Sequence, residues 1–168
     1  GSGTNPRLVV TGFQPNLMWV KAATTGNAAN WRSSSTSDNT AQFFSATIAD
    51  ASTNYYTTIS STGFNVGTTN NASTVLYHFA AFKNTTNLVN VGSYTGNTSD
   101  NRDISGVGFV PDYLFIKNAG LAVGAVANVT ENYGDSTSYF TDTANLVNSI
   151  QALQTGGFQL GNEATYTA

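Results

Sequence analysis

The sequence contains no cysteine, a single histidine and only two glutamates, and these shortages exclude several kinds of functional site. Without cysteine the chain can form neither a disulfide bond nor a thiolate metal site. One histidine, His78, cannot build a histidine-based zinc site, and no Gly-x-Ser-x-Gly motif supplies a serine for it to activate. Glu131 and Asp135 lie four residues apart on an expected turn, which is a poor scaffold for the paired carboxylates of a glycosidase. We therefore expect a protein that is not an enzyme and that binds no metal and no cofactor.

Charged residues are also scarce, at 9% of the chain against roughly 25% in ordinary domains. The six lysines and arginines are spread along the sequence and the net charge is −3, so no basic patch is present to neutralise phosphates. No apolar run approaches the roughly 20 residues that a membrane-spanning helix needs. We therefore expect neither nucleic acid as a partner nor insertion into a membrane.

Hydroxyl and amide side chains take the place of charge. Asparagine, threonine, serine and glycine together make up 77 of the 168 residues. At the same time 40% of the residues are hydrophobic and 12% aromatic, which is enough to bury a core and argues against disorder. Thr, Tyr, Phe and Val favour strands, whereas helical stripes are scarce, so we predict an all-β fold. The composition is that of exposed proteins and indicates an extracellular location or the surface of a virion.

A ten-residue segment occurs twice, as Gly-Phe-Gln-Pro-Asn-Leu-Met-Trp-Val-Lys at 12–21 and as Gly-Phe-Val-Pro-Asp-Tyr-Leu-Phe-Ile-Lys at 108–117. Two further pairs of segments follow in the same order, residues 38–43 with 135–140 and residues 63–67 with 157–161. The offsets are 96, 97 and 94 residues, so a unit of roughly 95 residues is used almost twice. This repetition predicts two domains, residues 1–86 and 87–168.

Short strand candidates separated by turn residues predict that each unit is a β-sandwich of jelly-roll or immunoglobulin-like type. In the first unit they are residues 7–13, 17–21, 30–33, 40–44, 55–60, 63–67 and 74–82. Residues 17–21 form a continuous apolar run, the pattern of a strand that is covered on both faces. Residues 145–153 are compatible with a short helix, but their counterpart in the first unit is rich in Tyr, Thr and Ile, which favours a strand.

Each unit lacks one strand that the other has. The first has no counterpart of residues 89–95, and the second stops before a counterpart of residues 75–82. Exposed sheet edges pair with whatever strand is offered. Two interpretations follow: the chain is a slice of a longer repeat array, or neighbouring subunits complete each other's sheets.

The order of four motifs resembles a known repeat family. These are Tyr-Thr-Gly at 94–96, Gly-Phe-x-Pro-Asp before an apolar strand at 108–117, Gly-Asp-Ser-Thr at 134–137 and Gly-Phe-x-Leu-Gly at 157–161. In this order they resemble uncharacterised tandem β-sandwich repeats of phage tail-fibre-like structural proteins and of bacterial surface proteins. The resemblance covers nearly the whole chain and implies a structural role, and no catalytic or cofactor-binding residues are carried over from it.

Three sets of residues are candidates for function. Strand edges that could mediate assembly carry Leu8, Val9, Val10, Phe13, Val75, Leu76, Tyr77, Phe79 and Phe82. Rings that could stack on a sugar are Trp31, Tyr55, Tyr56, Tyr94, Tyr133 and Tyr139. Asparagines in N-glycosylation motifs are Asn71, Asn84, Asn97 and Asn128.

These observations favour a non-enzymatic structural or assembly protein, a repeat subunit of an extracellular filament, fibre or virion appendage that polymerises through its sheet edges. The expected partner is then a second copy of the chain. The alternative is a receptor- or glycan-binding module of a tail fibre or adhesin, because amide-rich loops and aromatic rings suit a cell-surface glycan or receptor.

Overall fold

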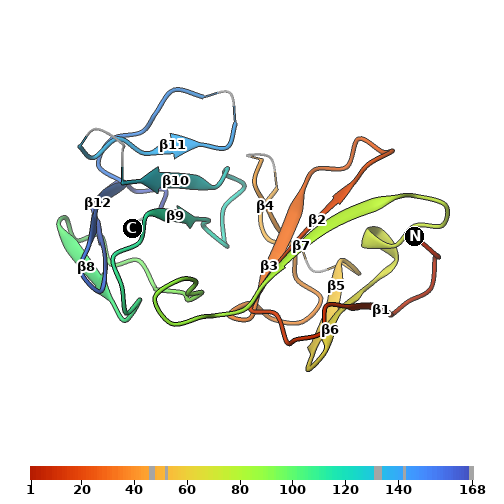
Figure 1. Ribbon diagram of the computed structural model, residues 1–168. Helices are drawn as coiled ribbons and strands as arrows, with labels where there is room; N and C mark the ends of the chain where they lie inside the picture. The colour runs from red at the N-terminus through yellow and green to blue at the C-terminus, as the bar shows by residue number, and fades with distance from the viewer. Residues whose placement is uncertain (46–47, 52, 131–133, 142, 167–168) are drawn as a thin grey trace.

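The computed structural model describes residues 1–45, 48–51, 53–130, 134–141 and 143–166. Within these residues the chain forms thirteen short strands, one 3-10 helix and no α-helix, which confirms the all-β prediction. Figure 1 shows the strands in two groups side by side, with the chain crossing from one group to the other after β7. The first group is formed by residues 7–82 and the second by residues 102–160.

The strands are short, as the closely spaced turn residues predicted. The first half contains β1 (Arg7–Val10), β2 (Leu17–Ala22), β3 (Asn30–Ser33), β4 (Gln42–Phe43), β5 (Tyr56–Ser60), β6 (Gly63–Val66), the 3-10 helix η1 (Thr68–Asn70) and β7 (Tyr77–Phe82). The second half contains β8 (Arg102–Ser105), β9 (Tyr113–Ile116), β10 (Val126–Val129), β11 (Ser138–Tyr139), β12 (Ile150–Gln154) and β13 (Gly157–Leu160). Residues 150–154 are therefore a strand, as preferred over the helix.

Four antiparallel sheets result, two in each half. The first half has a sheet of order β1-β6-β5 and a sheet of order β4-β3-β2-β7. The second half has β8-β13-β12 and β11-β10-β9. The second pair of sheets repeats the first strand for strand, except that the described residues provide no counterpart of β7 beside β9.

The repetition extends to single residue pairs. Arg7 pairs with Val66 as Arg102 pairs with Leu160. A β-bulge between Tyr56 and Thr58 recurs between Ile150 and Ala152. Because a one-residue slip would move every side chain of a strand to the other face, equal registers show that equivalent residues lie on the same face of their sheets.

The register also corrects one detail of the sequence alignment. Asn30 pairs with Phe43, and in the second half Val126 pairs with Tyr139. Phe43 therefore corresponds to Tyr139, and Phe44 to Phe140, an offset of 96 residues where the sequence had suggested 97. The sequence comparison was misled because two aromatic residues stand next to each other in both copies.

Two glycine positions explain why the motifs recur. Gly63 and Gly157 open equivalent strands, where a Cβ atom would collide with the carbonyl oxygens of Val9 and Ile104 on the paired strand. Gly12 and Gly108 have φ angles of 83° and 89°, in the left-handed region that disfavours other residues. The repeated Gly-Phe pairs are therefore requirements of the backbone rather than signs of chemistry.

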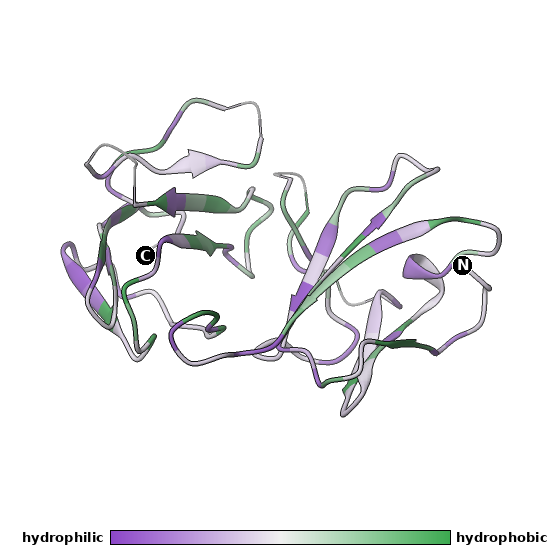
Figure 2. Ribbon diagram, viewed as in Figure 1, coloured by the Kyte–Doolittle hydropathy of each residue, from purple (hydrophilic) through white to green (hydrophobic). Residues whose placement is uncertain are grey.

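Each half buries one cluster of apolar side chains that comes from both of its sheets. The first core is formed by Met18, Val20, Ala41, Phe43, Tyr56, Phe64 and Val66. The second is formed by Ile116, Val126, Ile150, Phe158, Leu160 and Tyr166. In Figure 2 the strands β9 and β10, which contribute Ile116 and Val126 to the second core, contain green apolar segments. β1 is green as well, although most of its side chains are exposed.

Strand β3 is buried along its whole length although it consists of polar residues and one tryptophan. Asn30 and Asn70 exchange two amide hydrogen bonds, of 3.1 and 2.8 Å. Arg32 forms an ion pair with Asp38, whose side chain is 58% exposed. These contacts offset part of the cost of taking the polar groups out of water. Nε1 of Trp31 and Nε and Nη1 of Arg32 are buried without a hydrogen-bond partner among the described residues.

Candidate functional site: sheet edges and the aromatic contact between the halves

The two halves meet through five aromatic rings, which we call the aromatic cluster: Trp19, Trp31, Phe44, Phe115 and Phe140. The ring of Phe115 lies 5.2 Å from Trp31, 5.9 Å from Phe44 and 6.3 Å from Trp19. Phe44 and Phe140 lie 4.9 Å apart. Trp19 is on β2 and Trp31 on β3, and both side chains point away from the core to which Met18 and Val20 contribute. The cluster therefore joins the outer faces of two sheets.

The contact is close to two-fold symmetric. Trp19 pairs with Trp31 at the register where Phe115 pairs with Ala127, so Trp19 and Phe115 are equivalent. Phe44 and Phe140 are equivalent as well, and each of these residues contacts its own counterpart. Contacts between equivalent residues are the mark of an isologous interface, which uses the same surface patch on both partners. The two halves thus pack through one surface used twice.

Polar groups contribute less to this contact than the rings. Two backbone hydrogen bonds cross it, from Ala125 to Phe44 and from Asp50 to Ala119, each of 3.3 Å. Burial raises the pKa of Asp50 and lowers the pKa of Lys117, although each charge partly offsets this effect on the other. In both groups the loss of water outweighs the attraction between the two charges, so this attraction is weak evidence for stability.

The aromatic cluster and the cores absorb most of the rings that were candidates for binding a sugar. Trp31 is 7% exposed and Tyr56 is fully buried, with its hydroxyl donating to the Asn30 carbonyl at 3.0 Å. Neither ring has an open face, so the structure removes both from the candidate list.

The remaining tyrosines do not form a platform. Tyr55 packs against Phe43 in the first half. Tyr94 and Tyr139 both pack against the core of the second half, and Tyr133 lies outside the described residues. The alternation of residues along the strands and the composition could not predict which tyrosines are buried, because an aromatic residue on a strand suits a core and a binding face alike.

Buried tyrosines make the fold sensitive to alkali. Burial raises the pKa of Tyr56 well above the usual value of 10.0, and it also raises the pKa of Tyr94, Tyr113 and Tyr166. A group whose folded pKa is raised contributes stability below its unfolded pKa and loses it as the pH rises. We therefore expect circular dichroism to show unfolding that begins above about pH 10, together with a cooperative rise in tyrosinate absorbance.

The variant Tyr56→Phe is the control, because it removes the most strongly shifted hydroxyl and keeps the ring. Its unfolding in alkali should begin at a higher pH than that of the unaltered chain. Titration of all tyrosines in one step near pH 10, with the circular dichroism unchanged, would contradict the expectation.

The four glycosylation candidates divide into two buried and two exposed asparagines. Asn71 is 1% exposed, and its side-chain amide donates to Ser2 and Thr4 while its carbonyl oxygen accepts from Arg7. Asn128 is 4% exposed and donates to the Ile150 carbonyl. These two are not accessible for modification in the folded chain, which corrects the sequence prediction. Asn84 and Asn97 are exposed.

The assembly candidates lie where the sequence placed them, on or beside edge strands. β1 forms the end of one sheet and β7 the end of the other. Among these candidates the most exposed side chains are Val10 at 66%, Leu76 at 57%, Phe79 at 52% and Leu8 at 44%. The other members are half-buried, namely Val9, Phe13, Val75, Tyr77 and Phe82. Whether these edges assemble remains a prediction.

The second half presents a further edge on β9. β2 pairs with β3 on one side and with β7 on the other, whereas β9 pairs with β10 alone. In the part of the chain that the structure describes, no backbone hydrogen bond reaches residues 113–116 from any segment other than β10. We call the unpaired side the open edge of β9.

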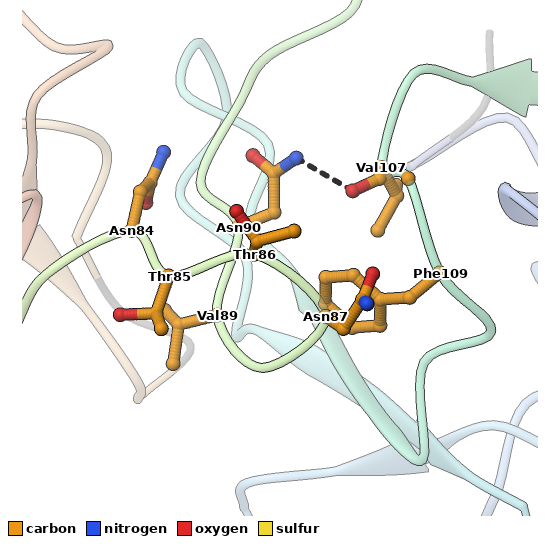
Figure 3. A pocket seen from close by; sticks show the side chains of 9 residues that line it. Asn84, Thr85, Thr86, Asn87, Val89, Asn90, Val107 and Phe109 are labelled. Atoms are coloured by element: carbon orange, nitrogen blue, oxygen red, sulfur yellow. Dashed lines mark hydrogen bonds between the residues drawn. The ribbon is translucent and has the colours of Figure 1, made fainter.

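Two shallow hollows lie at the two copies of the Gly-Phe-x-Pro turn. One, of about 280 Å³, separates the loop of residues 84–90 from the turn that contains Val107 and Phe109. Figure 3 shows the amide and hydroxyl side chains of this loop opposite that turn, with Asn90 donating to the Val107 carbonyl at 2.8 Å. The other hollow, of about 490 Å³, lies beside Phe13, Ser61 and Lys83.

Sequence reasoning missed the contact that Trp19, Phe44, Phe115 and Phe140 form between the two halves. A signal was present, because the continuous apolar run at 17–21 indicated a strand covered on both faces. The run could not indicate that the cover on its second face is the other half of the same chain.

No helix among the described residues is long and apolar enough to cross a membrane. The same residues contain no group of three or more His, Cys, Asp or Glu side chains placed to hold a metal ion. Comparison of the chain with protein-family models, with curated proteins and with solved structures finds no match.

Proposed function

We propose that this chain is a non-enzymatic structural and assembly protein, a subunit of an extracellular filament, fibre or virion appendage that polymerises through its sheet edges. The observation that carries this proposal is the difference between two equivalent strands. β2 has a strand on both sides, whereas β9 has one side open. An unpaired edge offers a row of backbone donors and acceptors to another strand.

The proposal includes the division into two tandem β-sandwiches, residues 1–86 and 87–168. The support is that each half has two sheets whose side chains meet in one core. The equal registers of the two halves support it further, because the described strands of the second half match β1 to β6 of the first.

The aromatic cluster has a clear role in such a subunit. An isologous contact is closed, because both copies of the surface are already used. Growth of a polymer must therefore use other surfaces, and exposed apolar residues on β1 and β7 are the candidates, together with the open edge of β9. The cluster would hold the two halves in one orientation and so fix the geometry of the edges.

A receptor- or glycan-binding module remains the alternative, and one observation favours it. The hollow between residues 84–90 and 107–109 combines amide and hydroxyl groups with the half-buried ring of Phe109. Such a combination suits a sugar, whose hydroxyls bond to amides and whose apolar face stacks on a ring. The hollow is small and open to solvent, so we place this function second.

The proposal predicts association that depends on concentration and on β1. Sedimentation velocity across a concentration series should show growing species, and electron microscopy should show filaments or rings. The double variant Leu8→Lys with Val10→Lys should remain folded and monomeric, because lysines on an edge strand oppose pairing. Both side chains are exposed, so the fold should tolerate the change.

Val147→Lys is the matched control, because Val147 is 61% exposed and lies outside the strands. It should assemble like the unaltered chain. Single compact particles at every concentration would contradict self-assembly, and thermal stabilisation by a member of a sugar panel would then support the alternative.

A further inference from the structure

We propose that the open edge of β9 is an acceptor site for an extended peptide strand with the residue pattern of β7. This inference rests on the proposed function and names the chemistry of the partner: a strand that runs antiparallel to β9 and alternates core-facing with outward-facing residues. The occupant adds to the sheet through backbone hydrogen bonds, the mode of recognition known as β-augmentation.

The first half shows how such an edge is filled. β7 runs antiparallel to β2 over six pairs, from Leu17 with Phe82 to Ala22 with Tyr77. β9 is the equivalent of β2, and the strand on its other side, β10, is the equivalent of β3. Transferring the register places the residue corresponding to Phe82 opposite Tyr113 and the one corresponding to Ala80 opposite Phe115.

The outward face of the acceptor requires a small residue at its centre. In the first half Ala80 lies opposite Trp19, whose ring packs on Phe82 at 5.1 Å. Phe115 takes the place of Trp19 in the second half and belongs to the aromatic cluster. A bulky side chain opposite Phe115 would therefore compete with the rings that join the halves.

The two halves differ on the core-facing side of this edge, and the difference determines which side chain the incoming strand should carry there. In the first half Phe79 of β7 packs on Phe64, with ring centroids 5.8 Å apart. In the second half Tyr94 packs on Phe158, the equivalent of Phe64, at 6.1 Å. Tyr94 donates to the Tyr166 carbonyl, and Arg102 lies over its ring.

Tyr94 therefore already packs on the ring that a counterpart of Phe79 would contact. The incoming strand should carry a small residue at this position, and the native β7 sequence should bind more weakly than one with alanine there. This preference separates the acceptor from a sheet edge that pairs with any strand.

The test uses the full chain and a synthetic peptide of residues 74–83 that carries Phe79→Ala. Hydrogen exchange is followed by mass spectrometry at a chain concentration where sedimentation shows single particles. At about ten times the dissociation constant, the peptide should slow exchange of residues 113–117 by about tenfold. The unaltered 74–83 peptide should require a higher concentration for the same effect.

A peptide with prolines at the positions of both Phe79 and Ala80 is the control. The N–H groups of consecutive strand residues point to opposite sides, so one of the two prolines must remove a donor that faces β9. This peptide should leave the exchange of residues 113–117 unchanged. Slowing at β1, β7 or another edge in place of β9, or no slowing up to the solubility limit of the peptide, would overturn the acceptor site.

These results are independent of the test of self-assembly. If the chain polymerises but no peptide protects residues 113–117, the acceptor is refuted and the proposed function stands. If the peptide protects these residues and the chain never polymerises, the acceptor stands and the proposed self-assembly is refuted.

Discussion

Replacing Phe115 with alanine is expected to lower the free energy of unfolding by about 2–4 kcal/mol and to expose both tryptophans to water. Phe115 contacts Trp19, Trp31 and Phe44 across the boundary between the halves. Its removal leaves a gap in the centre of the aromatic cluster, and few polar contacts are present there to hold the halves together. The loss is below that of a fully buried ring because Phe115 is half-buried.

The chain provides a direct reporter for this prediction. It has two tryptophans, and both belong to the aromatic cluster. The fluorescence of the folded variant should therefore shift to longer wavelength, while urea unfolding gives the change in free energy. Leu88→Ala is the control, because Leu88 is 71% exposed and contacts neither core. Unchanged fluorescence in Phe115→Ala would show that the cluster does not join the halves in solution.

Phe64→Ala is expected to cost about 3–5 kcal/mol, because it removes a ring that is fully buried in the first core. The rings of Tyr56 and Phe79 both pack on Phe64, so little rearrangement can fill the cavity. If the halves are separate domains, the damage should be confined to the first half.

Hydrogen exchange resolved along the chain checks this confinement. In Phe64→Ala the amides of β5 and β6 should lose protection, while those of β12 and β13 keep most of theirs. Phe158→Ala is the matched variant, since Phe158 occupies the same position in the second half and is 6% exposed. It should show the reverse pattern. Equal loss in both halves of either variant would mean that the chain unfolds as one unit.

Much of the fold could be predicted from the sequence. The two copies of Gly-Phe-x-Pro predicted two similar halves, and glycine geometry explains why, since Gly12 and Gly108 adopt the same left-handed conformation. The strand preference was correct for residues 150–153, where Ile150 replaces Tyr56 at an equivalent bulge, whereas residues 145–149 precede the strand. Such features depend on the conformational preferences of neighbouring residues, and these preferences can be predicted from the sequence.

The candidate functional residues were harder to predict from the sequence. Trp31 and Tyr56 were candidates for a binding surface, and Asn71 and Asn128 for glycosylation, yet all four are buried. A sequence motif states which side chain is present, but burial depends on which segments, far apart in the chain, pack over it. Arg7, for example, lies 64 residues from Asn71 and donates to its side chain.

The sequence by itself determined the all-β class, the internal repeat and the edge character of β1 and β7, because backbone preferences and the two-residue period of strands act over short distances. Only the tertiary structure decided that one surface of each half packs on its own counterpart, through Trp19 with Phe115 and Phe44 with Phe140. It also decided that β9 keeps an open edge. Both features depend on how whole sheets are placed, and that placement results from packing summed over many side chains rather than from any single motif.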